Sequence, residues 1–131
     1  MHFGCWCSYK DMVAAPVQQT KSATLGIYLI AQSHGEDLRG PADPLHDRIV
    51  YIGQSRYVDR TMDATKTVRG SLLERAVAIE SGQLWFASWE SPWRSYGRRV
   101  DPIEWSTIEV CQKALILQFA TLYNKLPDLN R

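Results

Sequence analysis

Two apolar runs, each carrying one tyrosine and one glycine, constrain the fold of this chain more than any other feature. Residues 24–32 read Thr-Leu-Gly-Ile-Tyr-Leu-Ile-Ala-Gln, and residues 48–53 read Arg-Ile-Val-Tyr-Ile-Gly. Both runs are dominated by aliphatic and aromatic side chains, a composition typical of β-strands. Residues 33–47 between them are charged and contain Gly and Pro, which predicts a loop. Two strands joined in this way pair most simply as antiparallel neighbours.

A third strand and a first helix are predicted in the middle of the chain. Residues 83–89 have strand composition. Ser71 and Glu74 have the spacing of a capping box, and apolar residues at helical spacing follow them. We therefore expect a helix over about 71–82.

A last helix is expected from Thr107 to Asn124. Ser106 is a suitable N-cap, and Pro127 cannot continue a helix. The predicted fold is a small α+β domain, with a three-stranded antiparallel sheet flanked by helices.

Length and composition favour one globular domain over residues 1–131, with residues 1–22 as an N-terminal arm. The formal charge is only +1, so a nucleic-acid site must be a local basic patch. No apolar stretch approaches the ~20 residues of a membrane-spanning helix, so no membrane partner is expected. An odd count of three cysteines, without a secretory signal, favours reduced thiols and a cytoplasmic protein.

One polar residue stands out on the last helix. Cys111, Leu115, Gln118 and Leu122 are spaced by four, three and four residues, so they share a helix face. Gln118 is then either a marginal residue bonded to backbone or water, or a site residue that projects towards the sheet.

The order of these motifs resembles the GIY-YIG nuclease family. Gly26-Ile27-Tyr28 and Tyr51-Ile52-Gly53 match its paired tripeptides, and Pro127-Asp128-Leu129-Asn130 matches its terminal Pro-x-x-Asn. The resemblance covers about residues 24–130. It implies the three-stranded fold predicted above and metal-dependent hydrolysis of DNA phosphodiester bonds. A homodimer stays open, because dimeric and monomeric members share these motifs.

The resemblance also implies the catalytic residues. Tyr51 would activate water and Tyr28 would position it. Arg75 would stabilise the pentavalent phosphate, which requires an insertion after Gly53. A family glutamate that binds one Mg²⁺ or Mn²⁺ ion corresponds to Gln118, whose amide is a weaker ligand for a hard cation. The implied enzyme is therefore inactive or weakened, either naturally or by an engineered Glu-to-Gln change.

Ordinary structural roles are the alternative interpretation of these residues. Strand tyrosines are ordinarily packing residues, and Arg75 is otherwise a surface arginine paired with Glu74 or Glu80. The family's terminal Asn, here Asn130, supports the site by hydrogen bonding.

DNA contacts are expected from basic residues in two polar segments, the insertion after Gly53 and the loop after the third strand. These are Arg56, Arg60, Arg94, Arg98 and Arg99. Two other functions remain: a non-catalytic nucleic-acid binding module, and a protein-interaction domain that uses the Trp-rich stretch 85–105.

Overall fold

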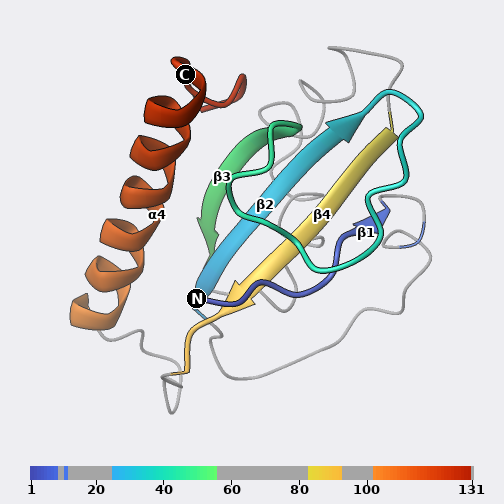
Figure 1. The fold of residues 1–131 in the computed structure, drawn as a ribbon. Helices are drawn as coiled ribbons and strands as arrows, with labels where there is room; N and C mark the ends of the chain where they lie inside the picture. The colour runs from blue at the N-terminus through green and yellow to red at the C-terminus, as the bar shows by residue number, and fades with distance from the viewer. Residues whose placement is uncertain (9–10, 12–24, 56–82, 93–101, 131) are drawn as a thin grey trace.

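The computed structural model describes residues 1–8, 11, 25–55, 83–92 and 102–130, and in this part of the chain the fold is α+β (Figure 1). A four-stranded antiparallel sheet has the order β1-β4-β2-β3. One long helix, α4, lies beside β3. The elements are β1 (Cys7–Ser8), β2 (Gly26–Ser33), β3 (Ile49–Ser55), β4 (Gln83–Glu90) and α4 (Pro102–Tyr123).

β2 is the central strand of the sheet and explains the continuous apolar run in the sequence. It pairs with β3 on one side and β4 on the other, and all eight of its residues are buried. A strand that is covered on both faces cannot alternate apolar and polar residues. The three predicted strands are confirmed as antiparallel neighbours, with ends shifted by one or two residues.

The sheet has one strand more than predicted, because the N-terminal arm contributes β1. Cys7 pairs with Phe86 of β4. The Gly4 amide donates to the Ser88 carbonyl at 3.0 Å, and the Trp6 amide donates to Gly40 at 2.8 Å. Phe3 and Trp6 are buried in the core. The start of the arm is therefore part of the sheet, and the three-stranded prediction is corrected to four strands within the described residues.

Helix α4 begins five residues earlier than predicted. Pro102 occupies its first position, where the missing N–H has no intrahelical partner to lose. Ser106 lies inside the helix and is not its cap. At the other end Asn124 has φ 55°, the left-handed conformation that commonly ends a helix. Asn124, rather than Pro127, therefore ends α4.

The two faces of the sheet carry different clusters. The larger cluster contains Ile27, Leu29 and Ile52 of the sheet together with the buried residues of α4. The second cluster, which we call the tyrosine face, consists of Tyr28, Ile30, Val50, Leu84 and Leu129, with Tyr51 and Phe86 packed against them. Because successive strand residues point to opposite faces, α4 and the tyrosines lie on opposite sides of the sheet.

The predicted helix over 71–82 lies outside the described residues, as does the arm beyond residue 11. Residues 34–48 form the predicted loop, in which Gly35 and Gly40 adopt positive φ angles that favour glycine. Within the described residues we find no helix with the length and apolar character needed to cross a bilayer.

Candidate functional site

Two tyrosines from neighbouring strands meet on the tyrosine face. Tyr28 is opposite Gly53, and Tyr51 is opposite Ile30, in the β2–β3 register. The register shifts beside Ile30, so that Val50 is the extra residue of a β-bulge next to Tyr51. The ring centroids of Tyr28 and Tyr51 are 5.6 Å apart, with an interplanar angle of 42°. The strand pairing thus brings together the two tyrosines that the sequence singled out.

Both tyrosine rings lie directly against Gly53. A Cβ atom at this position would lie 2.5 Å from Tyr28 Cζ and 2.5 Å from Tyr51 Cε1. Real Cβ atoms essentially never come this close to other heavy atoms. Gly53, the glycine of the second tripeptide, therefore leaves room for the tyrosine side chains of both tripeptides, Tyr28 and Tyr51.

Phe86 of β4 extends the aromatic cluster. Its ring stacks on Tyr28 at a centroid distance of 5.8 Å and an interplanar angle of 17°. Tyr28 is buried between its neighbours, whereas Tyr51 and Phe86 are half-buried. Tyr51 is thus the more accessible of the two tyrosines.

The environment keeps the Tyr28 hydroxyl protonated. Burial raises its pKa well above the ordinary value, and Tyr51 raises it further through charge and a side-chain hydrogen bond. A phenol with a raised pKa can donate a hydrogen bond but cannot act as a base near neutral pH. Tyr28 is therefore suited to positioning a ligand.

Two side chains hold β3 at the residue between Tyr51 and Gly53. Asn130 Oδ1 accepts a hydrogen bond from the Ile52 amide at 2.8 Å, and Asn130 Nδ2 donates to the Ile52 carbonyl at 2.9 Å. Gln112 Nε2 of α4 donates to the same carbonyl at 3.0 Å. The Leu129 amide donates to Val50 at 2.8 Å, which extends the contact along the edge of β3. We call these bonds the edge clamp.

Gln112 was missed by the sequence reasoning, although a signal was present. It lies four residues after Ile108 and three before Leu115, and both of these residues are buried. A polar residue in that stripe needs a hydrogen-bond partner, which here is the backbone of β3.

Gln118 does not face the core as the helix spacing predicted. Its side chain is exposed, and so is Leu122. The buried face of α4 passes through Ile108, Leu115 and Phe119. The predicted and the observed stripe share Leu115, but the other residues of the predicted stripe lie further around the helix, away from the sheet. Among the described residues, no recorded interaction joins Gln118 to Tyr28 or Tyr51.

The other predicted site residues lie outside the described part of the chain. They are Arg56, Arg60, Arg75, Arg94, Arg98 and Arg99. Within the described ranges, no group of three or more His, Cys, Asp or Glu side chains could hold a metal ion.

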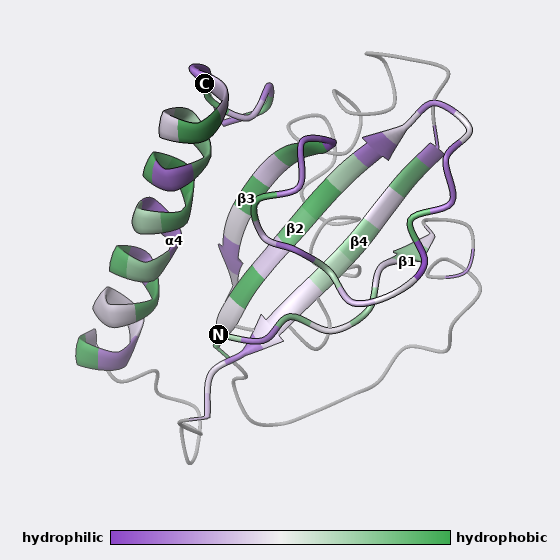
Figure 2. Cartoon of the chain, in the orientation of Figure 1, coloured by the Kyte–Doolittle hydropathy of each residue, from purple (hydrophilic) through white to green (hydrophobic). Residues whose placement is uncertain are grey.

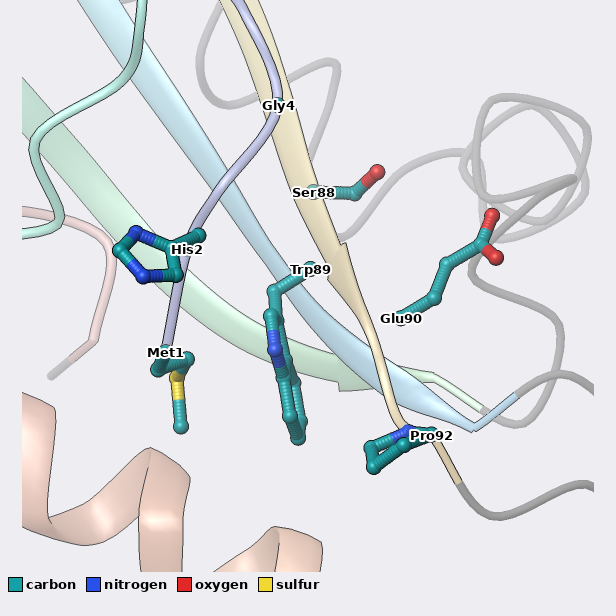
Figure 3. Close-up of a pocket in the computed structure, with 7 residues that line it drawn as sticks. All are labelled: Met1, His2, Gly4, Ser88, Trp89, Glu90 and Pro92. Atoms are coloured by element: carbon teal, nitrogen blue, oxygen red, sulfur yellow. The ribbon is translucent and has the colours of Figure 1, made fainter.

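An open hollow of about 700 Å³ lies where the first residues of the chain cross the end of β4. In Figure 3 the Trp89 indole stands between Met1 and Pro92, while Ser88 and Glu90 point away from it. Ser88 is opposite Tyr28 in the β2–β4 register, but the residues that line the hollow bring no converging set of polar groups to it.

The tryptophans of the 85–105 stretch are used largely by the fold. Trp85 is 2% exposed, and its Nε1 donates to Ser33 Oγ at 2.8 Å. Trp89 and Trp105 are partly buried against the same core cluster as Trp85. Trp93 lies outside the described residues. These contacts weaken the protein-interaction alternative, because the three described rings are packing residues.

Comparisons with known proteins add no relative: no family model, no curated protein and no solved structure matches this chain.

Proposed function

We propose that this chain is a DNA endonuclease domain whose hydrolytic activity is weakened by the amide at position 118. The observation that carries the proposal is the contact of Tyr28 and Tyr51 over Gly53. Packing alone does not require two hydroxyl-bearing rings beside each other. The edge clamp supports the proposal, because it fixes the strand that carries Tyr51.

The described residues suggest a division of labour at a phosphodiester. Tyr28 keeps its proton and would donate to a phosphate oxygen. The more accessible Tyr51 would accept a proton from attacking water as a phenolate, a form that a neighbouring positive charge would have to stabilise. Arg75 remains our candidate for stabilising the charged phosphate, and the basic residues that flank the third strand remain candidates for DNA contacts.

A divalent ion does not fit the described residues well. Mg²⁺ and Mn²⁺ prefer charged oxygen ligands, whereas Gln118 offers a neutral carbonyl on an exposed helix surface. We therefore assign no step to the metal in this chain. A glutamate at position 118 would supply the carboxylate that the resemblance implies. Gln118→Glu therefore tests whether this exposed position of α4, which lies on the other side of the sheet from the tyrosines, takes part in the reaction.

The test is a nicking assay on supercoiled plasmid with Mg²⁺ or Mn²⁺, comparing the chain with Gln118→Glu. If position 118 is the metal ligand that the resemblance implies, cleavage should rise at least about tenfold, since even outer-shell partners of a metal are worth 10–100-fold. Gln118→Ala is the matched control and should show no gain. Adding Tyr51→Phe to Gln118→Glu should abolish the gain, because the proposed proton acceptor is removed.

A second function, nucleic-acid binding without catalysis, is favoured by the exposure of Gln118 away from the core. This function predicts that the chain binds DNA in the presence of EDTA and that the affinity falls as the salt concentration rises. The affinity should be equal for the unsubstituted chain and for Gln118→Glu. Fluorescence anisotropy with labelled DNA measures this binding. Binding without cleavage in any variant would reject the nuclease proposal, and no binding at low salt would reject both functions.

A further inference from the structure

The outward side of α4 carries an apolar stripe of exposed side chains. Ile103, Val110 and Leu117 are 77%, 66% and 67% exposed. They are seven residues apart, which is close to two helical turns, so they lie in one row. Hydrophobic residues recur along the whole length of α4 (Figure 2). The row lies about opposite to the buried residues of the same helix.

The residue four positions after each of the three large side chains is small. Thr107, Ala114 and Thr121 are exposed and lie in the same row. Thr107 Oγ1 donates to the Ile103 carbonyl at 2.8 Å, and Thr121 Oγ1 donates to Leu117 at 2.9 Å. Because both hydroxyls already have partners within the helix, covering them would leave no unpaired donor.

The charges of α4 indicate the chemistry of whatever covers this stripe. The helix contains only Glu104, Glu109 and Lys113 as charged residues, and Lys113 pairs with Glu109 at 3.1 Å. Helices that lie on lipid surfaces, or that bind nucleic acid, are rich in Lys and Arg. This helix has a slight negative excess, so its stripe fits an apolar protein surface.

We propose that the stripe is the contact surface of a homodimer, in which α4 packs antiparallel against α4 of a second copy. A two-fold axis near residue 112 would place Val110 beside Ala114 of the partner copy. The same axis would place Ile103 beside Thr121, and Leu117 beside Thr107. Every large side chain then meets a small one, so the surface is complementary to itself, as a two-fold interface requires.

The dimensions of the stripe set the strength of this dimer. From Ile103 to Thr121 the row spans about 27 Å at 1.5 Å per residue. One helix pair of this length belongs to the small class of interfaces, below roughly 1,200 Å² in total, which form weak complexes. The dimer should therefore be reversible and dependent on concentration.

Sedimentation equilibrium of the full chain, up to about 1 mM, tests the proposal. We expect a monomer–dimer equilibrium within this range. Leu117→Glu should weaken association at least about tenfold, since it places a charge at the interface in both copies. Leu122→Glu is the matched control: Leu122 is 59% exposed on the same helix but lies outside the stripe, so association should not change.

Circular dichroism and thermal melting would show whether each variant is folded. If Leu117→Glu does not fold, Val110→Glu replaces it with the same expected loss. A chain that remains monomeric up to the highest concentration would overturn the proposal, as would equal weakening by Leu117→Glu and Leu122→Glu. The proposal is independent of nuclease activity, because no residue of the tyrosine face takes part in the contact.

Discussion

The two faces of the sheet are built from the same strands but differ in composition. The face covered by α4 carries apolar residues such as Ile27 and Ile52, which are fully buried in one cluster with Phe119 of the helix. The tyrosine face places two hydroxyl groups among its apolar residues and leaves Tyr51 half-buried. Because strand side chains alternate, one sequence forms both faces, one with the larger apolar cluster and one whose cluster also carries two tyrosine hydroxyl groups.

This difference predicts how substitutions on the two faces should affect stability. Removing a fully buried apolar side chain leaves a cavity, whereas changing a polar residue on a partly open face mainly alters contacts and proton affinity. Substitutions on the α4 side should therefore reduce stability most. Substitutions on the tyrosine face should have smaller effects on stability, and these effects should depend on the packing of the rings or on pH.

The largest effect is expected for Phe119→Ala on the α4 side. Phe119 is fully buried and its ring contacts Tyr123, so the cavity should cost about 3–5 kcal/mol of unfolding free energy. Urea denaturation measures this loss. Leu122→Ala, at an exposed position on the same helix, should stay within about 0.5 kcal/mol. Similar losses for the two variants would mean that α4 does not cover the sheet as described.

A smaller effect is expected for Gly53→Ala on the tyrosine face. The added methyl group would overlap both tyrosine rings, and overpacking of this kind typically costs about 1–3 kcal/mol. Near-ultraviolet circular dichroism should change as the rings move. Gly4→Ala is the control, because its Cβ would lie 3.7 Å from the Ser88 carbonyl oxygen, an ordinary contact. An unchanged spectrum in Gly53→Ala would contradict the ring arrangement.

The smallest effect is expected for Tyr28→Phe, and it depends on pH. At pH 7 the loss of one hydrogen bond should cost about 0.5–1.5 kcal/mol. Above the unfolded-state pKa of about 10, the unfolded chain releases the Tyr28 proton while the folded chain keeps it, since the folded pKa is raised. The stability that Tyr28 contributes is therefore present below pH 10 and is lost as pH rises further.

Urea unfolding of the chain and of Tyr28→Phe between pH 7 and 11 measures this dependence. The stability of the unsubstituted chain should fall more steeply above about pH 10 than that of Tyr28→Phe. Parallel curves would show that Tyr28 does not retain its proton in the folded state.

The sequence predicted the central elements well because their signals are local. The strands around Tyr28 and Tyr51, and the strand over 83–89, carry their apolar composition in consecutive residues. β1 has only two residues, and it exists because β4 offers an edge far along the chain. No local period could reveal such a strand.

The candidate site was predictable only in part. Tyr28 and Tyr51 meet as expected, because antiparallel pairing fixes their shared face. The orientation of α4 was misjudged, because apolar residues lie on more than one side of the helix and several stripes fit the spacing. Of the two interpretations of Gln118, the one in which it projects towards the sheet is therefore wrong, and Gln112, which does contact β3, was overlooked. Asn130 makes hydrogen bonds as the resemblance implied, but its role in catalysis stays a prediction.

The edge clamp has a consequence for the order of events during synthesis. Asn130 and Ile52, which it joins, are 78 residues apart in the chain. The edge clamp is complete only when both Gln112 and Asn130 have been synthesised, and until then part of the outer edge of β3 is open, as an edge that can pair with other chains. The outer edge of the strand that carries Tyr51 is thus completed late in the synthesis of this domain.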